Sequence, residues 1–74
     1  MVVGQRGENL EQKTIRHFKE MKDEMDCWKN EFTIAKNGRN TDYEDFCIMM
    51  IRICENTISY LEDFAADHYI TLSK

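Results

Sequence analysis

The residues best suited to bind a ligand are cations near the start of the chain. Residues 4–7 read Gly-Gln-Arg-Gly, and glycine lets a backbone approach a ligand closely. Arg6 can bind a phosphate through two parallel hydrogen bonds, and a helix beginning shortly afterwards offers free N–H groups. Arg16 and Lys19 follow within four turns of that helix. We therefore expect an anion site made of Gly4, Gln5, Arg6, Arg16 and Lys19. The alternative for Arg16 and Lys19 is a solvated helix face with lysine–glutamate pairs.

The chain lacks the residue spacings of a catalytic or metal site. His17 has no serine or cysteine three or four residues away, so a nucleophile–base pair is not expected there. The cysteines and histidines form neither a C-x-x-C nor an H-x-x-x-H pair, and structural zinc sites normally use such spacing. Three cysteines, an odd number, suggest reduced thiols in a cytoplasm. We expect no enzyme activity, no cofactor and no metal.

The net charge and the length of the apolar runs limit the kinds of partner that the chain is expected to bind. The formal net charge is −4, which disfavours duplex DNA as a ligand. Residues 1–40 carry eight Lys/Arg and seven Asp/Glu, whereas residues 41–74 carry two and seven. The longest uncharged apolar run, residues 46–51, is too short to cross a bilayer. The polar residues that directly follow Met1–Val3 also predict no signal peptide, so we expect a cytoplasmic protein without a membrane span.

Apolar residues in the first half recur at the spacing of an amphipathic helix. They are separated by three or four residues and comprise Ile15, Phe18, Met21, Met25, Trp28, Phe32 and Ala35. Asn9 is a good N-cap, and Gln12 stands at the capping-box position. Asn37-Gly38 favours a stop, with Gly38 in the left-handed conformation. The pattern predicts a helix over 9–36, preceded by an N-terminal segment over 1–8.

A second helix is predicted over 41–69, after a turn over 37–40. Thr41 as N-cap and Glu44 three residues later would complete a capping box. The apolar stripe alternates spacings of four and three through Tyr43, Cys47, Met50, Cys54, Thr57, Leu61 and Phe64. Phe46, Ile53 and Tyr60 widen it on one side, and residues 70–74 are expected to be a frayed tail.

The short turn makes the two helices antiparallel neighbours, so the chain is predicted to be one all-α helical hairpin over 1–74. Within residues 46–54 only Arg52 is polar, and one partner helix cannot cover so wide an apolar arc. Arg52 itself should either face a site or be paired, with Glu55 as its local partner. Because exposed apolar patches usually mark partner surfaces, we expect assembly into a homo-oligomeric helical bundle. The alternative is a third short helix in residues 1–8 that covers the arc.

The order of these features resembles one family of small phage proteins. Gly4 and Arg6 precede an amphipathic stretch, residues 15–22, that reads Ile-Arg-His-Phe-Lys-Glu-Met-Lys, and a turn and an apolar helix follow. This layout is similar to the helical-hairpin type of the phage anti-CBASS family, which are sponges for cyclic oligonucleotide immune signals. The resemblance implies oligomers in a host cytoplasm with a cyclic di- or trinucleotide bound between subunits near Arg6. That family has an aromatic residue where this chain has Gln5, so base stacking is not implied there.

Two classes of function remain open from the sequence. In the first, the chain is a non-enzymatic anti-defence protein that sequesters cyclic oligonucleotides in pockets between subunits. In the alternative, it is a helical protein-interaction module that inhibits or bridges a host protein, which the acidic second half favours. A bundle that binds RNA through the cations of the first helix ranks third, because the overall acidity counts against it.

Overall fold

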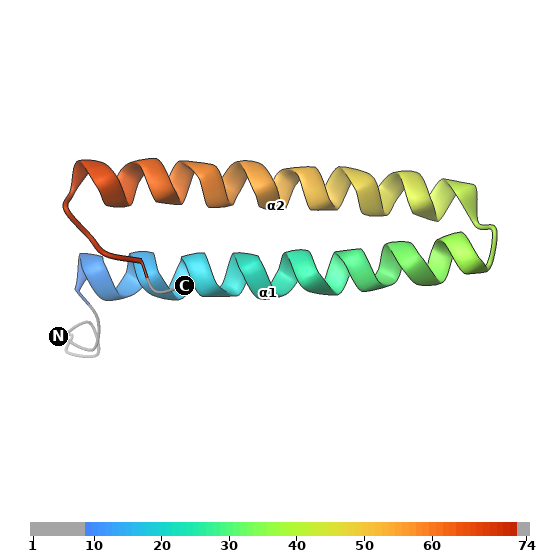
Figure 1. The fold of residues 1–74 in the computed structure, drawn as a ribbon, viewed down its shortest axis with the longest axis horizontal. Helices are drawn as coiled ribbons and strands as arrows, with labels where there is room; N and C mark the ends of the chain where they lie inside the picture. Colours follow the sequence, from blue (N-terminus) through green and yellow to red (C-terminus); the bar gives the residue numbers. More distant parts are fainter. Residues whose placement is uncertain (1–8, 73–74) are drawn as a thin grey trace, which may run out of the picture.

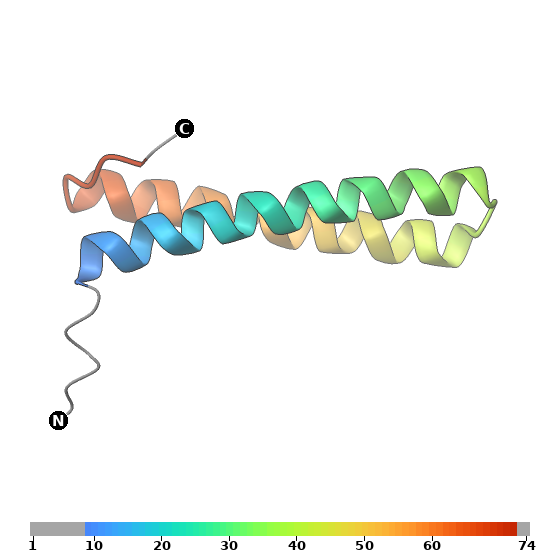
Figure 2. The same ribbon diagram turned by 90° about the horizontal axis from the view of Figure 1, so that it is seen from below.

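A computed structural model describes residues 9–72, and they form two helices joined by a tight turn. Helix α1 spans Leu10–Asn37 and helix α2 spans Thr41–Asp67. They run antiparallel and side by side, as Figure 1 shows, and cross at a shallow angle in Figure 2. The predicted all-α hairpin is confirmed. The predicted segment over 1–8, with its alternative third helix, lies outside the described residues.

The core is a seam in which contacts alternate every four and three residues along both helices. On α1 the seam residues are Thr14, Phe18, Met21, Met25, Trp28, Phe32 and Ala35. On α2 the seam residues are those predicted from the four-and-three spacing: Tyr43, Cys47, Met50, Cys54, Thr57, Leu61 and Phe64. Among them, Cys47 and Cys54 are almost fully buried. A mean repeat of 3.5 residues keeps one face of each helix against the other, as in a left-handed coiled coil.

The core of α1 includes Thr14, which the predicted apolar stripe did not contain. Ile15 is half-buried, and Thr14 occupies the buried position beside it. The alternating repeat requires a residue four positions before Phe18, and that residue is Thr14. Its hydroxyl donates a hydrogen bond of 2.8 Å to the carbonyl oxygen of Leu10, so burial leaves no unsatisfied polar atom there.

The start of α1 matches the predicted capping box. The Asn9 side-chain oxygen accepts a hydrogen bond from the Gln12 N–H at 2.8 Å. In return, the Asn9 N–H donates to the Gln12 side-chain oxygen at 3.2 Å. The helix runs one residue further than the predicted 9–36, because Asn37 remains helical.

The turn differs from the prediction in which residue is left-handed. Gly38 has φ −85° and ψ 0°, so it remains right-handed, and Arg39 takes the positive φ of 57° instead. The Asn40 N–H donates to the carbonyl of Ala35 at 2.9 Å, and the Arg39 N–H donates to Lys36 at 3.1 Å. These two bonds form a Schellman motif whose left-handed position falls one residue after the glycine.

Helix α2 begins at Thr41, as predicted, but its N-cap lies one residue earlier than expected. The N-cap is Asn40, whose side-chain oxygen accepts from the Tyr43 N–H at 3.2 Å, and Thr41 is already helical. Asn40 therefore ends α1 with its backbone N–H and begins α2 with its side chain. Because one residue serves both helices, the connection is short and the hairpin is tightly closed.

The second helix ends at Asp67, two residues before the predicted end of 69. Tyr69 takes a positive φ of 57°, and the Ile70 N–H donates to the carbonyl of Ala65 at 2.8 Å. Ile70 is half-buried, so the first part of the predicted frayed tail folds back on the helix end in a second Schellman motif. Residues 73–74 lie outside the described part.

Candidate functional site

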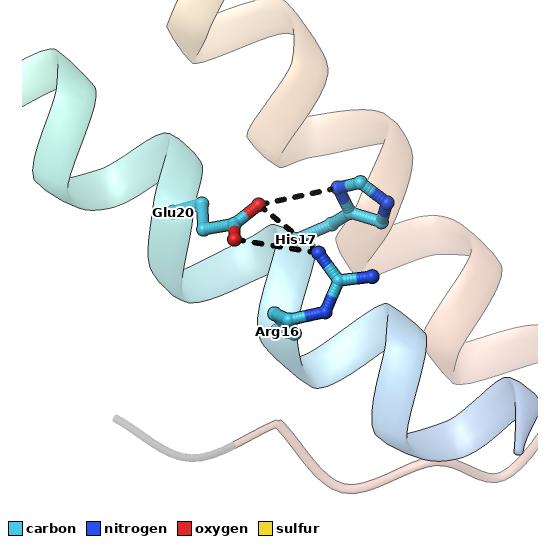
Figure 3. Close-up of polar contacts among 3 residues, drawn as sticks. All are labelled: Arg16, His17 and Glu20. Atoms are coloured by element: carbon cyan, nitrogen blue, oxygen red, sulfur yellow. Dashed lines mark hydrogen bonds and ion pairs between the residues drawn. The ribbon is translucent and has the colours of Figure 1, made fainter. Parts of the chain in front are cut away.

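The predicted anion site is only partly within the described residues. Gly4, Gln5 and Arg6 lie outside residues 9–72. Arg16 and Lys19 are exposed on α1, away from the seam. Arg16 Nη1 lies 3.3 Å and 3.4 Å from the two carboxylate oxygens of Glu20, and His17 Nδ1 lies 3.6 Å from Glu20 Oε1 (Figure 3).

This part of α1 is therefore a surface of mixed charge. Glu20 supplies negative charge between Arg16 and His17, and Asp23 follows Lys19 at the i,i+4 spacing that brings side chains together. An exposed i,i+4 ion pair contributes only about 0.3–0.5 kcal/mol. A strong anion can thus displace Glu20 from Arg16, but these cations do not make a positively charged pocket by themselves.

Two of the three cysteines are buried between the helices, and the third is exposed. Cys47 and Cys54 lie in the seam, and burial, helped by nearby Glu31 and Glu24, raises the pKa of each thiol. A buried thiol with a raised pKa stays protonated and unreactive near neutral pH. Cys27 is exposed. No group of three or more metal-ligating side chains comes together in residues 9–72.

One hydrogen bond joins the two helices near the turn. The Tyr43 hydroxyl donates to Glu31 Oε1 at 2.9 Å, and this bond, together with partial burial, raises the pKa of Tyr43. The Tyr43 ring stacks on Phe46 at a centroid distance of 6.1 Å, and Trp28 meets Phe46 edge-on at 5.6 Å. These rings form an aromatic cluster that closes the seam and continues onto the surface through Phe46.

Phe46 begins a row of exposed apolar side chains along α2, which we call the α2 stripe. Its members are Phe46, Met49, Ile53 and Tyr60, which are 43%, 47%, 48% and 74% exposed. Spacings of three, four and seven residues place them on one side of the helix. Ile48, another exposed apolar residue of α2, points roughly 120° away from the stripe at 100° per residue.

Charged residues lie along one edge of the α2 stripe. Asp45 and Arg52 are seven residues apart, so they share this edge, and both are exposed. The predicted pair between Arg52 and Glu55 does not form in the described part of the chain, where the ion pairs lie on α1. The edge therefore offers a carboxylate and a guanidinium to whatever covers the stripe.

Sequence reasoning found most members of this surface but not its organisation. Phe46, Ile53 and Tyr60 were expected to widen a single broad apolar arc. The structure places Ile53 and Tyr60 outside the seam, because Cys47 and Cys54 occupy the contact with α1, whereas Phe46 lies at the edge of the seam, where it meets Trp28. Their spacing, together with Met49, is the signal that marks a second face. No spacing rule pointed to the contact between Tyr43 and Glu31.

Neither helix in residues 9–72 is long and apolar enough to span a membrane. Comparisons with protein-family models, curated proteins and solved structures found no match to this chain. The assignment of a candidate site therefore rests on the geometry of this chain.

Proposed function

We propose that this chain is a non-enzymatic protein-interaction module that binds a partner helix on the α2 stripe. The observation that supports this proposal is the row formed by Phe46, Met49, Ile53 and Tyr60, four large apolar side chains exposed on one side of a helix. Helices recognise grooves and other helices through anchors at such spacings. Inhibition or bridging of a host protein, the alternative considered from the sequence, is one form that this function could take.

The stripe has the composition of an interaction surface. Burying an exposed Ile, Phe or Met side chain contributes about 1.5–3 kcal/mol, so even half-exposed anchors supply several kcal/mol to association. Phe46 is held in place by stacking with Tyr43 and edge contact with Trp28. A side chain that is already ordered loses little entropy on binding, which makes Phe46 the best-prepared anchor.

Site-specific photo-crosslinking tests the proposal. A benzophenone amino acid replaces Tyr60, the most exposed member of the stripe, and in a matched control variant it replaces Ile48 on another side of α2. Each chain is irradiated inside the cells that express it, and adducts are resolved by mass. We expect an abundant adduct of defined mass from position 60 and a much weaker one from position 48. Equal adducts at both positions, or none at position 60, would overturn the proposal.

A second candidate function is sequestration of a cyclic di- or trinucleotide, the activity that the resemblance to phage sponges implies. The observation that favours it is the exposure of Arg16 and Lys19 on the first turns of α1. These residues belong to the end of α1 that follows Gly4, Gln5 and Arg6 in the sequence. In an oligomer, cations from neighbouring copies would supply the positive charge that one copy lacks.

Native mass spectrometry with a panel of cyclic di- and trinucleotides tests the second candidate. Sequestration predicts nucleotide mass added at fixed stoichiometry to an oligomer, and loss of that mass in an Arg16→Ala, Lys19→Ala double variant. A Lys29→Ala variant, which removes an exposed lysine further along α1, is the matched control. An oligomer that stays bare across the panel would contradict sequestration and leave the interaction module standing.

A further inference from the structure

We infer that the occupant of the α2 stripe is a second copy of this chain, packed antiparallel, α2 against α2, around a two-fold axis near Met49. This inference rests on the proposed function and names its partner. It depends on two properties of the α2 surface: the order of the exposed apolar residues, and the positions of two charges beside them.

The apolar residues are self-complementary in this arrangement. In an antiparallel pair centred near Met49, residues at similar distances before and after position 49 face each other. Phe46 of one copy then meets Ile53 of the second copy, and the reverse contact forms by symmetry. Tyr60 lies level with the second copy's turn, where Arg39 is exposed and can approach the face of the ring. All four members of the stripe are covered, including Tyr60, which is 74% exposed in the hairpin alone.

The charges select this register. Asp45 and Arg52 occupy the same edge of α2, one on each side of Met49. In the antiparallel pair, that edge faces the same edge of the second copy, so each Asp45 meets an Arg52 and two equivalent ion pairs form. If the axis lay at Ile53 instead, Arg52 would face Arg52 and Asp45 would approach Asp63. Like charges placed opposite each other suppress that alternative.

The resulting assembly is closed. An isologous contact uses the same surface on both copies and ends after two chains. Two hairpins joined through their α2 helices form a four-helix unit, the minimum predicted from the width of the apolar arc. The outer faces of α1, with Arg16 and Lys19, stay open to solvent in this unit, as they are in the single hairpin.

Charge reversal combined with mixing tests the inference. Asp45→Arg and Arg52→Asp are made separately, and sedimentation velocity measures each variant alone, the equimolar mixture, and the wild type, all under reducing conditions. Neither substitution touches the seam, and circular dichroism verifies that each variant remains helical. We expect the wild type to dimerise and each single variant to dimerise about tenfold more weakly or worse, because like charges then face each other twice.

The mixture gives the sharpest readout. In a heterodimer, the arginine introduced at position 45 of one copy faces the aspartate introduced at position 52 of the second copy. The unchanged Arg52 of the first copy and Asp45 of the second also face each other, so both ion pairs are restored. We therefore expect mixing to recover dimers at concentrations where neither variant dimerises alone. A mixture no more associated than its components would overturn the register.

A second pair of variants tests the use of the stripe itself. Ile53→Asp places a charge in the middle of the stripe, whereas the matched Ile48→Ser changes an exposed apolar residue on another side of α2. We expect the first to abolish dimerisation and the second to preserve it. The reverse result would overturn the stripe as the contact surface.

These outcomes separate the inference from the proposed function. A wild-type chain that remains monomeric while photo-crosslinking at position 60 gives an adduct of another mass would overturn the second copy as occupant and leave the interaction module intact. A wild-type dimer that survives Ile53→Asp would overturn both. An adduct of twice the chain mass at position 60, together with recovery on mixing, would support both.

Discussion

Tyr43 and Glu31 face each other across the hairpin, and the tyrosine hydroxyl donates a hydrogen bond of 2.9 Å to Glu31 Oε1. The two residues are twelve positions apart and belong to different helices. Within residues 9–72, this is the side-chain hydrogen bond that joins α1 to α2. Tyr43 also stacks on Phe46, so the bond helps to hold the ring from which the α2 stripe starts.

Removal of this hydroxyl should loosen the turn end of the hairpin. Tyr43→Phe keeps the ring and its stacking but leaves Glu31 without its partner, so we expect a lower thermal midpoint with unchanged helicity. Thr33→Val is the matched control, because it removes an exposed hydroxyl that bonds only within its own helix. Equal midpoints for Tyr43→Phe and the wild type would show that the bond contributes nothing.

The same bond makes a prediction for alkaline pH. The pKa of Tyr43 is raised from 10.0, first by its hydrogen bond to Glu31 and then by burial. Because the folded state binds this proton more tightly, the stabilisation is complete below about pH 10 and is lost as pH rises through the folded-state pKa. Absorbance titration of the wild type should show a late tyrosine ionisation that is absent from Tyr43→Phe, and the thermal midpoint of this variant should fall less between pH 9 and pH 11. A midpoint that falls equally in both proteins would contradict the prediction.

The turn predicts an unusual response to substitution of its glycine. A Cβ at Gly38 would meet the Ile34 carbonyl oxygen at 3.5 Å, an ordinary contact, and φ there is already right-handed. Gly38→Ala should therefore stabilise the hairpin by about 0.5 kcal/mol, because it restricts the unfolded chain. A loss of about 1 kcal/mol in urea unfolding would mean that Gly38 is left-handed after all.

Arg39 should give the complementary result. Its φ of 57° places a side chain in the left-handed region, which costs an ordinary residue about 1 kcal/mol. Arg39→Gly removes this cost but gives the unfolded chain more freedom, which offsets about 0.5–1 kcal/mol of the gain, so the net stabilisation in urea unfolding should be at most about 0.5 kcal/mol. Tyr69→Gly is the matched test at the second Schellman motif, where φ is also 57°. Destabilisation in both variants would contradict the assignment.

A few large side chains in the seam are expected to contribute most of the stability of the hairpin. Phe18 is 1% exposed, so Phe18→Ala should cost about 3–4 kcal/mol by leaving a cavity. Leu10→Ala, at a residue that is 53% exposed, should cost less than about 0.5 kcal/mol. Chemical denaturation of both variants checks the contrast. Similar losses in the two would mean that the seam does not carry the fold.

The sequence predicted the two helices well because each helix carries its own periodic pattern and its own breakers. Its errors lie where backbone geometry, rather than residue type, decides. Gly38 is the better residue for a left-handed site, but the seam fixes where α1 must end, and that places the site at Arg39. Asn40 and Thr41 are both good caps, and only the closed turn shows which one is used.

The candidate site, like the fold, has parts that the sequence could predict and parts that it could not. Arg16 and Lys19 are exposed on the outer face of α1, and the ion pair between Arg16 and Glu20 resembles the local pairs of the solvated face that the sequence left open as the alternative. The α2 stripe became distinct from the core only when the position of α1 was known. The sequence shows that α2 is apolar over a wider arc than one partner helix can cover. Only the structure shows which part of that arc α1 covers and which part stays exposed.

Two buried cysteines allow the opening of the hairpin to be measured by chemical labelling. Cys47 and Cys54 are sealed in one seam, seven residues apart, whereas Cys27 faces solvent. An alkylating reagent reaches the sealed thiols only during openings. If the seam parts as a unit and alkylation is faster than reclosing, intact-mass spectra will pass from one added group directly to three. A persistent population with two would reveal that the hairpin unzips from one end, and the modified cysteine would identify that end.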